Sequence, residues 1–412
     1  MAASGSCRRR SPWPDLPAEL LGLVLLRLPS HADRVRLPAV CRAWRSGARL
    51  QHPLPPPLPW LALPDGTFLS LPDGAVHRLP VVPDDVYYGV STGGALFLVH
   101  DDGRFSLASP FSAATVTLPE PPFWFSTDKI SKAVVSVHLV AVLRDSRVSI
   151  YAHGHGGGDL PAGASPTGME WWPPAHNSIA DIALFKGKLY VLTREEELHV
   201  LDTGDQQITN VCCIRKIPTP SHDYYDLDNL WNNDDYHHGT GMRVHIWNDD
   251  DYVSRDYLVV SGDQLLRVKR MIRVPSIYQT WKGDTGIDLQ RTYRFDVFEA
   301  SDLSCGRGRW RAVSTLMGCA LFVSQGCSQS VPAAAGTGIL QDCIYFLTKG
   351  SIITISNRDL LMKWTRENPF LDSGVYNMRD KTVAPLPLET SAASMLGTRD
   401  GMWPPAWLFP KT

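Results

Sequence analysis

The 412-residue sequence contains no apolar run of about 18 or more residues, which is the length that a helix needs to cross a bilayer. Its first ten residues include three arginines, but no apolar segment directly follows them, unlike in a secretory signal peptide. These absences argue against membrane proteins and secreted proteins. We therefore predict a protein of the nucleus and/or cytoplasm that binds no membrane.

Motifs for metal binding and for catalysis are also scarce. None of the eight cysteines belongs to a Cys-x-x-Cys pair, the usual spacing of zinc and redox sites. The glycine-rich stretch at 154–158 lacks the Gly-Lys-Ser/Thr that follows in a phosphate-binding loop. The acidic triplet at 195–197 falls in a predicted tight turn, where we expect solvated side chains. We accordingly predict no metal, no cofactor and no catalytic residue, and thus a protein that is not an enzyme.

Charge is unevenly distributed although the formal net charge is only -2. Residues 1–50 hold nine arginines against three acids, a balance of +6, and residues 222–256 hold nine aspartates against two arginines, a balance of -7. The arginines of the basic head alternate with apolar positions, and no set of aromatic residues for base stacking accompanies them. This pattern favours an acidic protein partner over nucleic acid, because complementary charge speeds encounter between proteins.

The stretch 13–49 has the pattern of short amphipathic helices. Asp15 is a helix cap candidate, Pro17 suits a first helical turn, and Pro29 ends the first helix. Apolar residues then recur at helical spacing in two sets: Leu20, Leu21, Val24, Leu25 and Leu28, then Val35, Leu37, Val40, Cys41 and Trp44. So small a unit buries too little surface to be stable alone, and we expect it to need a partner.

The same residues resemble the F-box, the motif by which substrate receptors dock on a Skp1-like adaptor and through it on a cullin. The resemblance lies in a Leu-Pro start, an acidic Glu19, a Leu-Pro end at 28–29 and a closing Val-Cys-Arg-x-Trp-Arg at 40–45. Pro38 and Gly22 depart from the pattern, since proline interrupts a helix and glycine weakens one. The resemblance implies these adaptor-binding residues: Leu16, Pro17, Leu20, Leu28, Pro29, Val40, Cys41 and Trp44.

Four regions follow from composition and periodicity. Residues 1–12 read as a disordered basic N-terminus, 13–50 as the F-box, and 51–59, QHPLPPPLP, as a stiff proline-rich linker. Residues 60–412 show short alternating strands separated by Gly, Asp and Pro turns, such as the pair at 67–71 and 76–79.

Hairpins repeated every 40 to 50 residues are typical of β-propeller blades, and the available length predicts six or seven. Two β-sandwiches are the alternative. The stretches 179–202, 291–347 and 402–410 are similar to parts of the KIB-type propeller of plants, which often follows an F-box. We therefore predict a small all-α F-box followed by an all-β domain, most simply a six- or seven-bladed propeller. Trp403 and Trp407 are expected to close its last blade or to lie across the propeller edge.

One long segment, at about 219–256, interrupts the repeat with an acidic and aromatic composition. Long segments of this kind are usually functional or disordered, and Trp and Tyr dominate protein interfaces. Both alternatives stay open here. If the segment binds a target protein, the candidate residues are Tyr224, Tyr225, Trp231, Tyr236 and Trp247.

The function implied by the resemblance is that of a substrate-recognition subunit of an SCF-type (Skp1-cullin-F-box) ubiquitin ligase. The F-box would dock the adaptor, and the propeller would bind a target protein whose identity the sequence does not reveal. Two alternatives remain: an F-box-like scaffold without a role in degradation, and a propeller enzyme with an accidental helical head.

Overall fold

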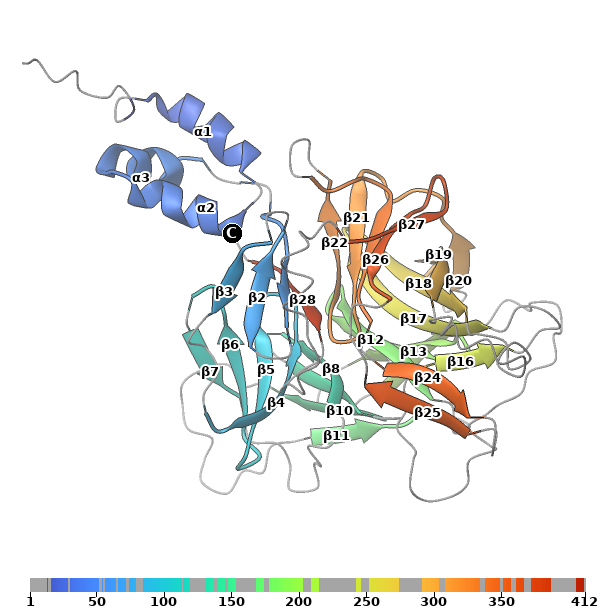
Figure 1. Cartoon of the computed structure of the whole chain (residues 1–412). Helices are drawn as coiled ribbons and strands as arrows, with labels where there is room; N and C mark the ends of the chain where they lie inside the picture. The colour runs from blue at the N-terminus through green and yellow to red at the C-terminus, as the bar shows by residue number, and fades with distance from the viewer. Residues whose placement is uncertain are drawn as a thin grey trace, which may run out of the picture.

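The computed structural model divides the chain into three short helices and a β-propeller (Figure 1). The residues it describes are 13, 16–28, 30–51, 54, 56–63, 66–71, 74–78, 84–112, 114–118, 130–136, 139–144, 147–152, 168–173, 178–202, 209–214, 242–245, 252–273, 291–303, 308–333, 338–348, 351–356, 361–366, 372–386 and 405–410.

The helical domain contains α1 (Ala18–Arg27), α2 (His31–Arg36), the 3-10 turn η2 (Leu37–Ala39) and α3 (Arg42–Arg49). Pro38 lies in η2, so the chain restarts its helix there, as the sequence predicts. The Ser30 hydroxyl accepts a bond from the Asp33 N–H at the start of α2. At the start of α3, Cys41 Sγ accepts the Trp44 N–H at 3.4 Å. Each restart therefore has its own side-chain cap.

Gly22 has a packing role that its helix propensity does not reveal. A Cβ at this position would lie 2.2 Å from Gln51 Oε1, and Gln51 Nε2 donates to the Ala18 carbonyl at 3.0 Å. The Gln51 side chain therefore packs directly on Gly22 of α1, because glycine has no Cβ that would clash with it.

Six sheets form the blades of the propeller in the described part of the chain. Blade I is β28 (Ala406–Leu408), β1 (Trp60–Ala62), β2 (Thr67–Ser70) and β3 (Val76–Arg78). Blade II is β4 (Val86–Ser91), β5 (Leu96–His100), β6 (Phe105–Ser109) and β7 (Ala114–Thr117). Blade III is β8 (Ile130–Val135), β9 (Leu139–Arg144), β10 (Arg147–Ala152) and β11 (Gly168–Trp171).

The later blades are larger. Blade IV is β12 (Ile179–Phe185), β13 (Lys188–Thr193), β14 (Leu198–Asp202) and β15 (Thr209–Ile214). Blade V is β16 (Met242–His245), β17 (Tyr252–Ser261), β18 (Gln264–Arg273), β19 (Arg291–Ser301) and β20 (Arg309–Ala312). Blade VI is β22 (Ser328–Pro332), β21 (Cys319–Val323), β23 (Cys343–Phe346), β26 (Gly374–Asn377) and β27 (Thr382–Ala384), and a separate hairpin pairs β24 (Ser351–Ser356) with β25 (Leu361–Arg366).

The propeller prediction is confirmed, with six blades. Strands β28, β4, β8, β12, β17 and β22 face one another around the centre, and apolar clusters fill the spaces between neighbouring sheets. Blade I is closed by the C-terminal strand, because Trp60 pairs with Leu408 and Leu61 with Trp407. Trp407 thus closes a blade as expected, although the blade is the first one; Trp403 lies outside the described residues.

The segment at 51–59 does not act as a free spacer at its described positions. Leu54 packs against the core of the helical domain, whereas Leu58 is 3% exposed and belongs to the cluster between blades I and VI. The segment therefore has one apolar anchor in each domain.

The three helices occupy one end of the propeller, and the β24–β25 hairpin occupies the other (Figure 1). The ring of His31 in α2 lies 5.0 Å from Phe111 and 6.2 Å from Trp60, which itself stacks on His77 at 4.2 Å. Burial, followed by the charge of Arg34, lowers the pKa of His31. This aromatic contact joins α2 to blades I and II and fixes the direction in which the helices project.

Candidate functional site

The helical domain has a core of four buried residues: Leu21, Leu25, Leu37 and Ala48. Leu16, Leu28, Trp44 and Leu54 pack around them. The Trp44 indole N–H also donates to the Trp13 carbonyl at 2.8 Å, which ties α3 to the residue before α1. The core is small, as expected for three short helices.

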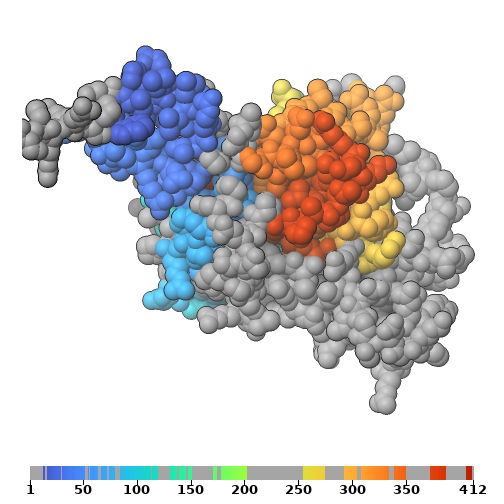
Figure 2. Space-filling view, turned by 45° about the horizontal axis from the view of Figure 1, so that its top comes forward, coloured from blue at the N-terminus to red at the C-terminus, as the bar shows by residue number. Residues whose placement is uncertain are grey.

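Helix α1 is apolar on its outer side as well as on its core side. Its exposed apolar side chains are Leu20 at 48%, Leu23 at 47%, Leu26 at 43% and Val24 at 42%. Figure 2 shows the helices, in blue, as a lobe that projects beyond the blades. A helix that is apolar all round is normally buried, and a continuous exposed apolar patch marks an interaction surface. The outer side of α1 is therefore the strongest candidate docking surface among the described residues.

The residues predicted to bind an adaptor divide into two groups. Leu20, Val40 at 63% exposed and Pro17 point to solvent. The other described members are half-buried and help to build the helical domain itself: Leu16, Leu28, Cys41 and Trp44. Pro29 lies outside the described residues. Sequence reasoning missed Leu23 and Leu26, although the all-round apolar character of α1 was the signal that pointed to them.

A groove elsewhere in the helical domain, lined mostly by α2, η2 and α3, combines apolar walls with basic groups. Its volume is about 440 Å³. Its lining residues are Leu25, Arg34, Val35, Pro38, Ala39, Arg45, Ala48, Arg49 and Leu54. Arg34 is 8% exposed, and its Nε donates to the Leu28 carbonyl at 2.7 Å. Arginines around an apolar floor suit an acidic, partly apolar partner segment.

The five aromatic residues predicted to bind a target, Tyr224, Tyr225, Trp231, Tyr236 and Trp247, lie outside the described residues. What the structure does describe near the centre of the propeller is a buried ion pair. Lys132 Nζ lies 2.8 Å from Asp181 Oδ1, and Asp181 Oδ2 accepts the Leu258 N–H at 2.7 Å. Burial raises the pKa of Asp181, and Lys132 opposes that shift. One aspartate thereby joins blades III, IV and V.

A Ser-His-Asp arrangement occurs in blade II. His100 Nε2 lies 2.7 Å from Ser106 Oγ, and its Nδ1 lies 3.0 Å from Asp85 Oδ2. Ser106 is only 3% exposed, so a substrate would not reach its hydroxyl. The corresponding strand position in blade III is Arg144, which contacts Ser149. The arrangement is best read as a polar link between the second and third strands of a blade.

The chain also contains one Gly-x-Ser-x-Gly pattern, at 89–93, which sequence reasoning passed over. This spacing surrounds nucleophilic serines in hydrolases. Here Ser91 is 1% exposed, and its hydroxyl donates to the Trp407 carbonyl at 2.6 Å. The serine therefore joins blade II to the C-terminal strand. Among the described residues no group of three or more metal-ligating side chains occurs, and no described helix is long and apolar enough to cross a membrane.

The expectation that residues 195–197 are solvated is wrong for Glu196. Its side chain is 13% exposed and lies 2.9 Å from Arg267 and 3.1 Å from Lys269. The Trp310 indole N–H donates to its carbonyl at 3.1 Å. The tight turn of blade IV therefore packs against blade V, where Arg267 and Lys269 of β18 form ion pairs with Glu196.

We expect Glu196 to make the protein less stable in acid. Burial alone raises the pKa of Glu196, but Arg267 and Lys269 outweigh that and hold it well below its ordinary value of 4.5. Because the folded-state pKa is the lower one, the stabilisation is complete above pH 4.5 and is lost as the pH falls toward the folded-state pKa. Glu196→Gln should cost about 2 kcal/mol at pH 7.

Urea unfolding of both proteins at pH 7 and at lower pH measures this difference. The gap between wild type and Glu196→Gln should shrink on acidification. A gap that is the same at every pH would contradict the assigned ion pair. Asp263→Asn is the matched control, because Asp263 has a side chain that is 97% exposed and faces the exposed Lys186, and such a surface pair contributes little.

Comparison with known proteins gives a match in each domain. A model described as the KIB1-4 beta-propeller matches residues 68–377, and a model described as F-box-like matches residues 13–49. The chain is also 45% identical over 49 residues to F-box protein At2g17690 of Arabidopsis thaliana. That similarity covers 11% of this chain and 12% of the Arabidopsis protein.

Similarity to solved structures is weak. A Saccharomyces cerevisiae assembly of Dbp5, Nup159 and Gle1 aligns with a TM-score of 0.31 and 10% identity, over 81% of this chain and 78% of that chain. The N-terminal domain of Nup159 aligns with a TM-score of 0.25 and 9% identity, over 73% of this chain and 63% of that chain. The description of the fold therefore depends on the strand pairing given above.

Proposed function

Because the chain belongs to the KIB1-4 beta-propeller family and carries an F-box-like domain in front of its propeller, we propose that it is the substrate-recognition subunit of an SCF-type ubiquitin ligase. The F-box docks a Skp1-like adaptor and through it a cullin, and the propeller binds a target protein. The chain itself performs no chemistry in this proposal. It holds the target close to the ubiquitin-charged enzyme, which makes the transfer effectively intramolecular.

The observation that carries this proposal is the outer side of α1. Four apolar side chains lie exposed along it, Leu20, Leu23, Val24 and Leu26, although α1 already uses its inner side for the helical core. A partner that covers these side chains removes apolar surface from water, at roughly 25 cal/mol per Å². The basic groove lined by α2, η2 and α3 supports an acidic partner segment.

The relative position of the two domains suits a receptor. The helices project from one end of the propeller, while the β24–β25 hairpin lies at the opposite end (Figure 1). A target bound at the opposite end would not compete with the adaptor for space. The contact of His31 with Trp60 and Phe111 would keep the distance between them constant.

We propose the nucleus and/or cytoplasm as the location. Cys41, Cys319, Cys327 and Cys343 are free thiols, in keeping with a reducing compartment. A fluorescent fusion of the full chain tests this. Retention of the fusion in the secretory pathway would contradict it.

Replacement of the exposed leucines of α1 by aspartate should strongly weaken adaptor binding. We expect Leu20→Asp combined with Leu23→Asp to weaken the affinity for a Skp1-like adaptor by about 100-fold or more, because two central apolar anchors of an interface typically contribute that much. Titration of the purified full chain with the adaptor measures this. Substitution of Leu16 is less informative, because Leu16 packs on the helical core and its loss would also destabilise the domain.

The matched control is Val116→Asp, which places the same charge at a valine that is 52% exposed on β7 of blade II. This variant should bind the adaptor like the wild type. Equal binding by the double variant and the wild type would mean that the adaptor does not use α1. No binding by the wild type would remove the receptor proposal altogether.

A role in degradation is separable from adaptor binding. Proximity labelling with the full chain identifies candidate targets, and a reconstituted ligase then shows whether ubiquitin transfer to a target requires the chain. A captured protein that is never ubiquitinated would favour a scaffold role.

A further inference from the structure

Two arginines face each other across the inner strands of blade V. Arg255 of β17 is the register partner of Arg270 of β18. Residues directly opposite in an antiparallel pair lie on the same face of the sheet, and like charges there oppose each other. Both residues are buried, Arg255 at 8% exposed and Arg270 at 0%. Burial intensifies the repulsion, because less water screens the charges.

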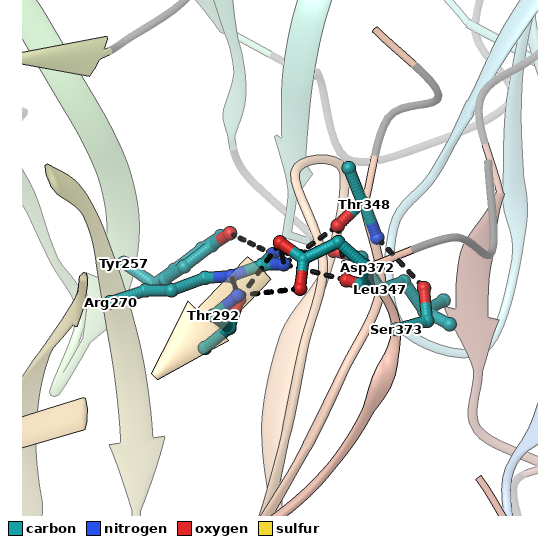
Figure 3. A network of polar contacts seen from close by, with 7 residues as sticks. All are labelled: Tyr257, Arg270, Thr292, Leu347, Thr348, Asp372 and Ser373. Carbon is teal, nitrogen blue, oxygen red and sulfur yellow. Dashed lines mark hydrogen bonds and ion pairs between the residues drawn. The ribbon is translucent and has the colours of Figure 1, made fainter. Parts of the chain in front are cut away.

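The charge of Arg270 is fully compensated, as Figure 3 shows. Its Nη2 lies 2.8 Å from Asp372 Oδ2, and its Nε lies 2.7 Å from Thr292 Oγ1. Further bonds join the guanidinium to the Leu347 carbonyl at 3.0 Å and to the Thr348 hydroxyl at 2.6 Å. Asp372 also accepts the Thr292 N–H and hydroxyl, so its oxygens are already used.

Arg255 has no comparable partner among the described residues. Its Nε is shielded from solvent and makes no hydrogen bond, and no described carboxylate forms an ion pair with it. Asp256, the next residue, points to Arg267 at 2.7 Å instead. A buried charge without a counter-ion is costly. The blade therefore holds one more buried positive charge than it has carboxylates to balance.

Arg255 lies toward the end of the propeller away from the helices. It is the fourth residue of β17, close to the start of that strand. Its neighbour Arg270 bonds Thr348 and Asp372, which flank the β24–β25 hairpin in sequence, and that hairpin lies at the end opposite α1–α3 (Figure 1).

We propose that Arg255, with Arg270 beside it, is the centre of an oxyanion-binding site that accepts a phosphate or carboxylate group. Such a group supplies the missing negative charge, and a guanidinium binds it through two parallel N–H···O bonds. Tyr257, whose hydroxyl lies 3.5 Å from Arg270 Nη1, lines the same face. The site does not depend on the ligase role, since adaptor binding takes place at the other end of the molecule.

Replacement of Arg255 tests the site in two ways. In buffer without phosphate or carboxylate, Arg255→Met should melt at the same temperature as the wild type or higher, because it removes an unbalanced buried charge. In calorimetric titration of the full chain with inorganic phosphate, the same variant should bind at least 10-fold more weakly. Arg255→Lys keeps the charge but loses the paired bonds, and should show intermediate binding.

Arg309→Met is the matched control, because Arg309 lies on β20 of the same blade with its side chain 72% exposed. It should bind phosphate like the wild type. Absence of phosphate and acetate binding by the wild type overturns the proposal. So does a lowered melting temperature or loss of folding in Arg255→Met, since either result means that the arginine serves an internal partner.

Peptides distinguish the source of the oxyanion. The wild type is titrated with one peptide in three forms, carrying phosphoserine, glutamate or serine at the same position. Binding of a charged form at least 10-fold tighter than the serine form, lost in Arg255→Met, assigns the site to a side chain of a protein partner. Binding of inorganic phosphate without that preference assigns it to a small free anion.

Discussion

Trp407→Ala should destabilise the full chain by about 3–5 kcal/mol, the usual loss for a buried tryptophan. Trp407 is 0% exposed and packs against Phe322 at a centroid distance of 5.1 Å. Its indole N–H donates to the Val323 carbonyl at 3.2 Å, and its own carbonyl accepts the Ser91 hydroxyl. The residue therefore connects blades I, II and VI at the point where the ring closes.

Chemical denaturation followed by circular dichroism measures this loss. Trp172→Ala is the matched control, because Trp172 is 56% exposed and the Arg147 guanidinium lies over its ring at 5.1 Å. Such an exposed contact contributes about 1 kcal/mol or less. Equal destabilisation by the two variants would show that the C-terminal strand does not close the propeller.

Asp372→Ala should cost about 3–5 kcal/mol, because it leaves the fully buried Arg270 without a counter-ion. The loss also frees the Thr292 N–H that Asp372 accepts at 2.7 Å. Asp372 follows the β24–β25 hairpin, whereas Arg270 and Thr292 belong to blade V. We therefore expect the contact between blades V and VI to weaken, with faster hydrogen exchange in β19 and β26.

A double-mutant cycle separates the ion pair from other effects. Arg270→Met combined with Asp372→Ala should lose less stability than the sum of the two single variants, by about 1–3 kcal/mol. Strict additivity would mean that the two residues do not interact. Asp263→Ala serves as the surface comparison, since the side chains of Asp263 and of its partner Lys186 are 97% and 60% exposed, and we expect a loss below about 1 kcal/mol.

The sequence by itself determined the order of the domains and the class of each. The helical spacing of Leu21 and Leu25 indicated an amphipathic helix, the Leu-Pro and Val-Cys-Arg-x-Trp-Arg motifs carried the resemblance to the F-box, and the repeated hairpins indicated the propeller. These features are local, because they depend on periods of a few residues and on turn residues such as the glycine in Lys186-Gly187, which adopts a φ of +77°. Pro38 likewise predicted an interruption of the second helix, because proline cannot donate a backbone hydrogen bond.

Only the tertiary structure decided which polar residues are buried and which apolar residues are not. The sequence predicts a solvated turn for Glu196, but blade V brings Arg267 to it. Leu20 and Val24 share the apolar helical spacing of Leu21 and Leu25, but the fold leaves them exposed on the outer side of α1. From the sequence, Gly22 is expected only to weaken α1, whereas in the structure it provides the space in which Gln51 packs.

The physical reason is that these outcomes depend on contacts between residues distant in sequence. Arg270 and Asp372 are separated by 102 positions and meet only when two blades pack together. Periodicity indicates which face of a strand or helix is apolar, but it does not indicate what that face will contact. The charges of Arg255 and Arg270 were visible in the chain. Their burial on one face of one blade, where among the described residues only Arg270 has a carboxylate partner, was a product of the fold.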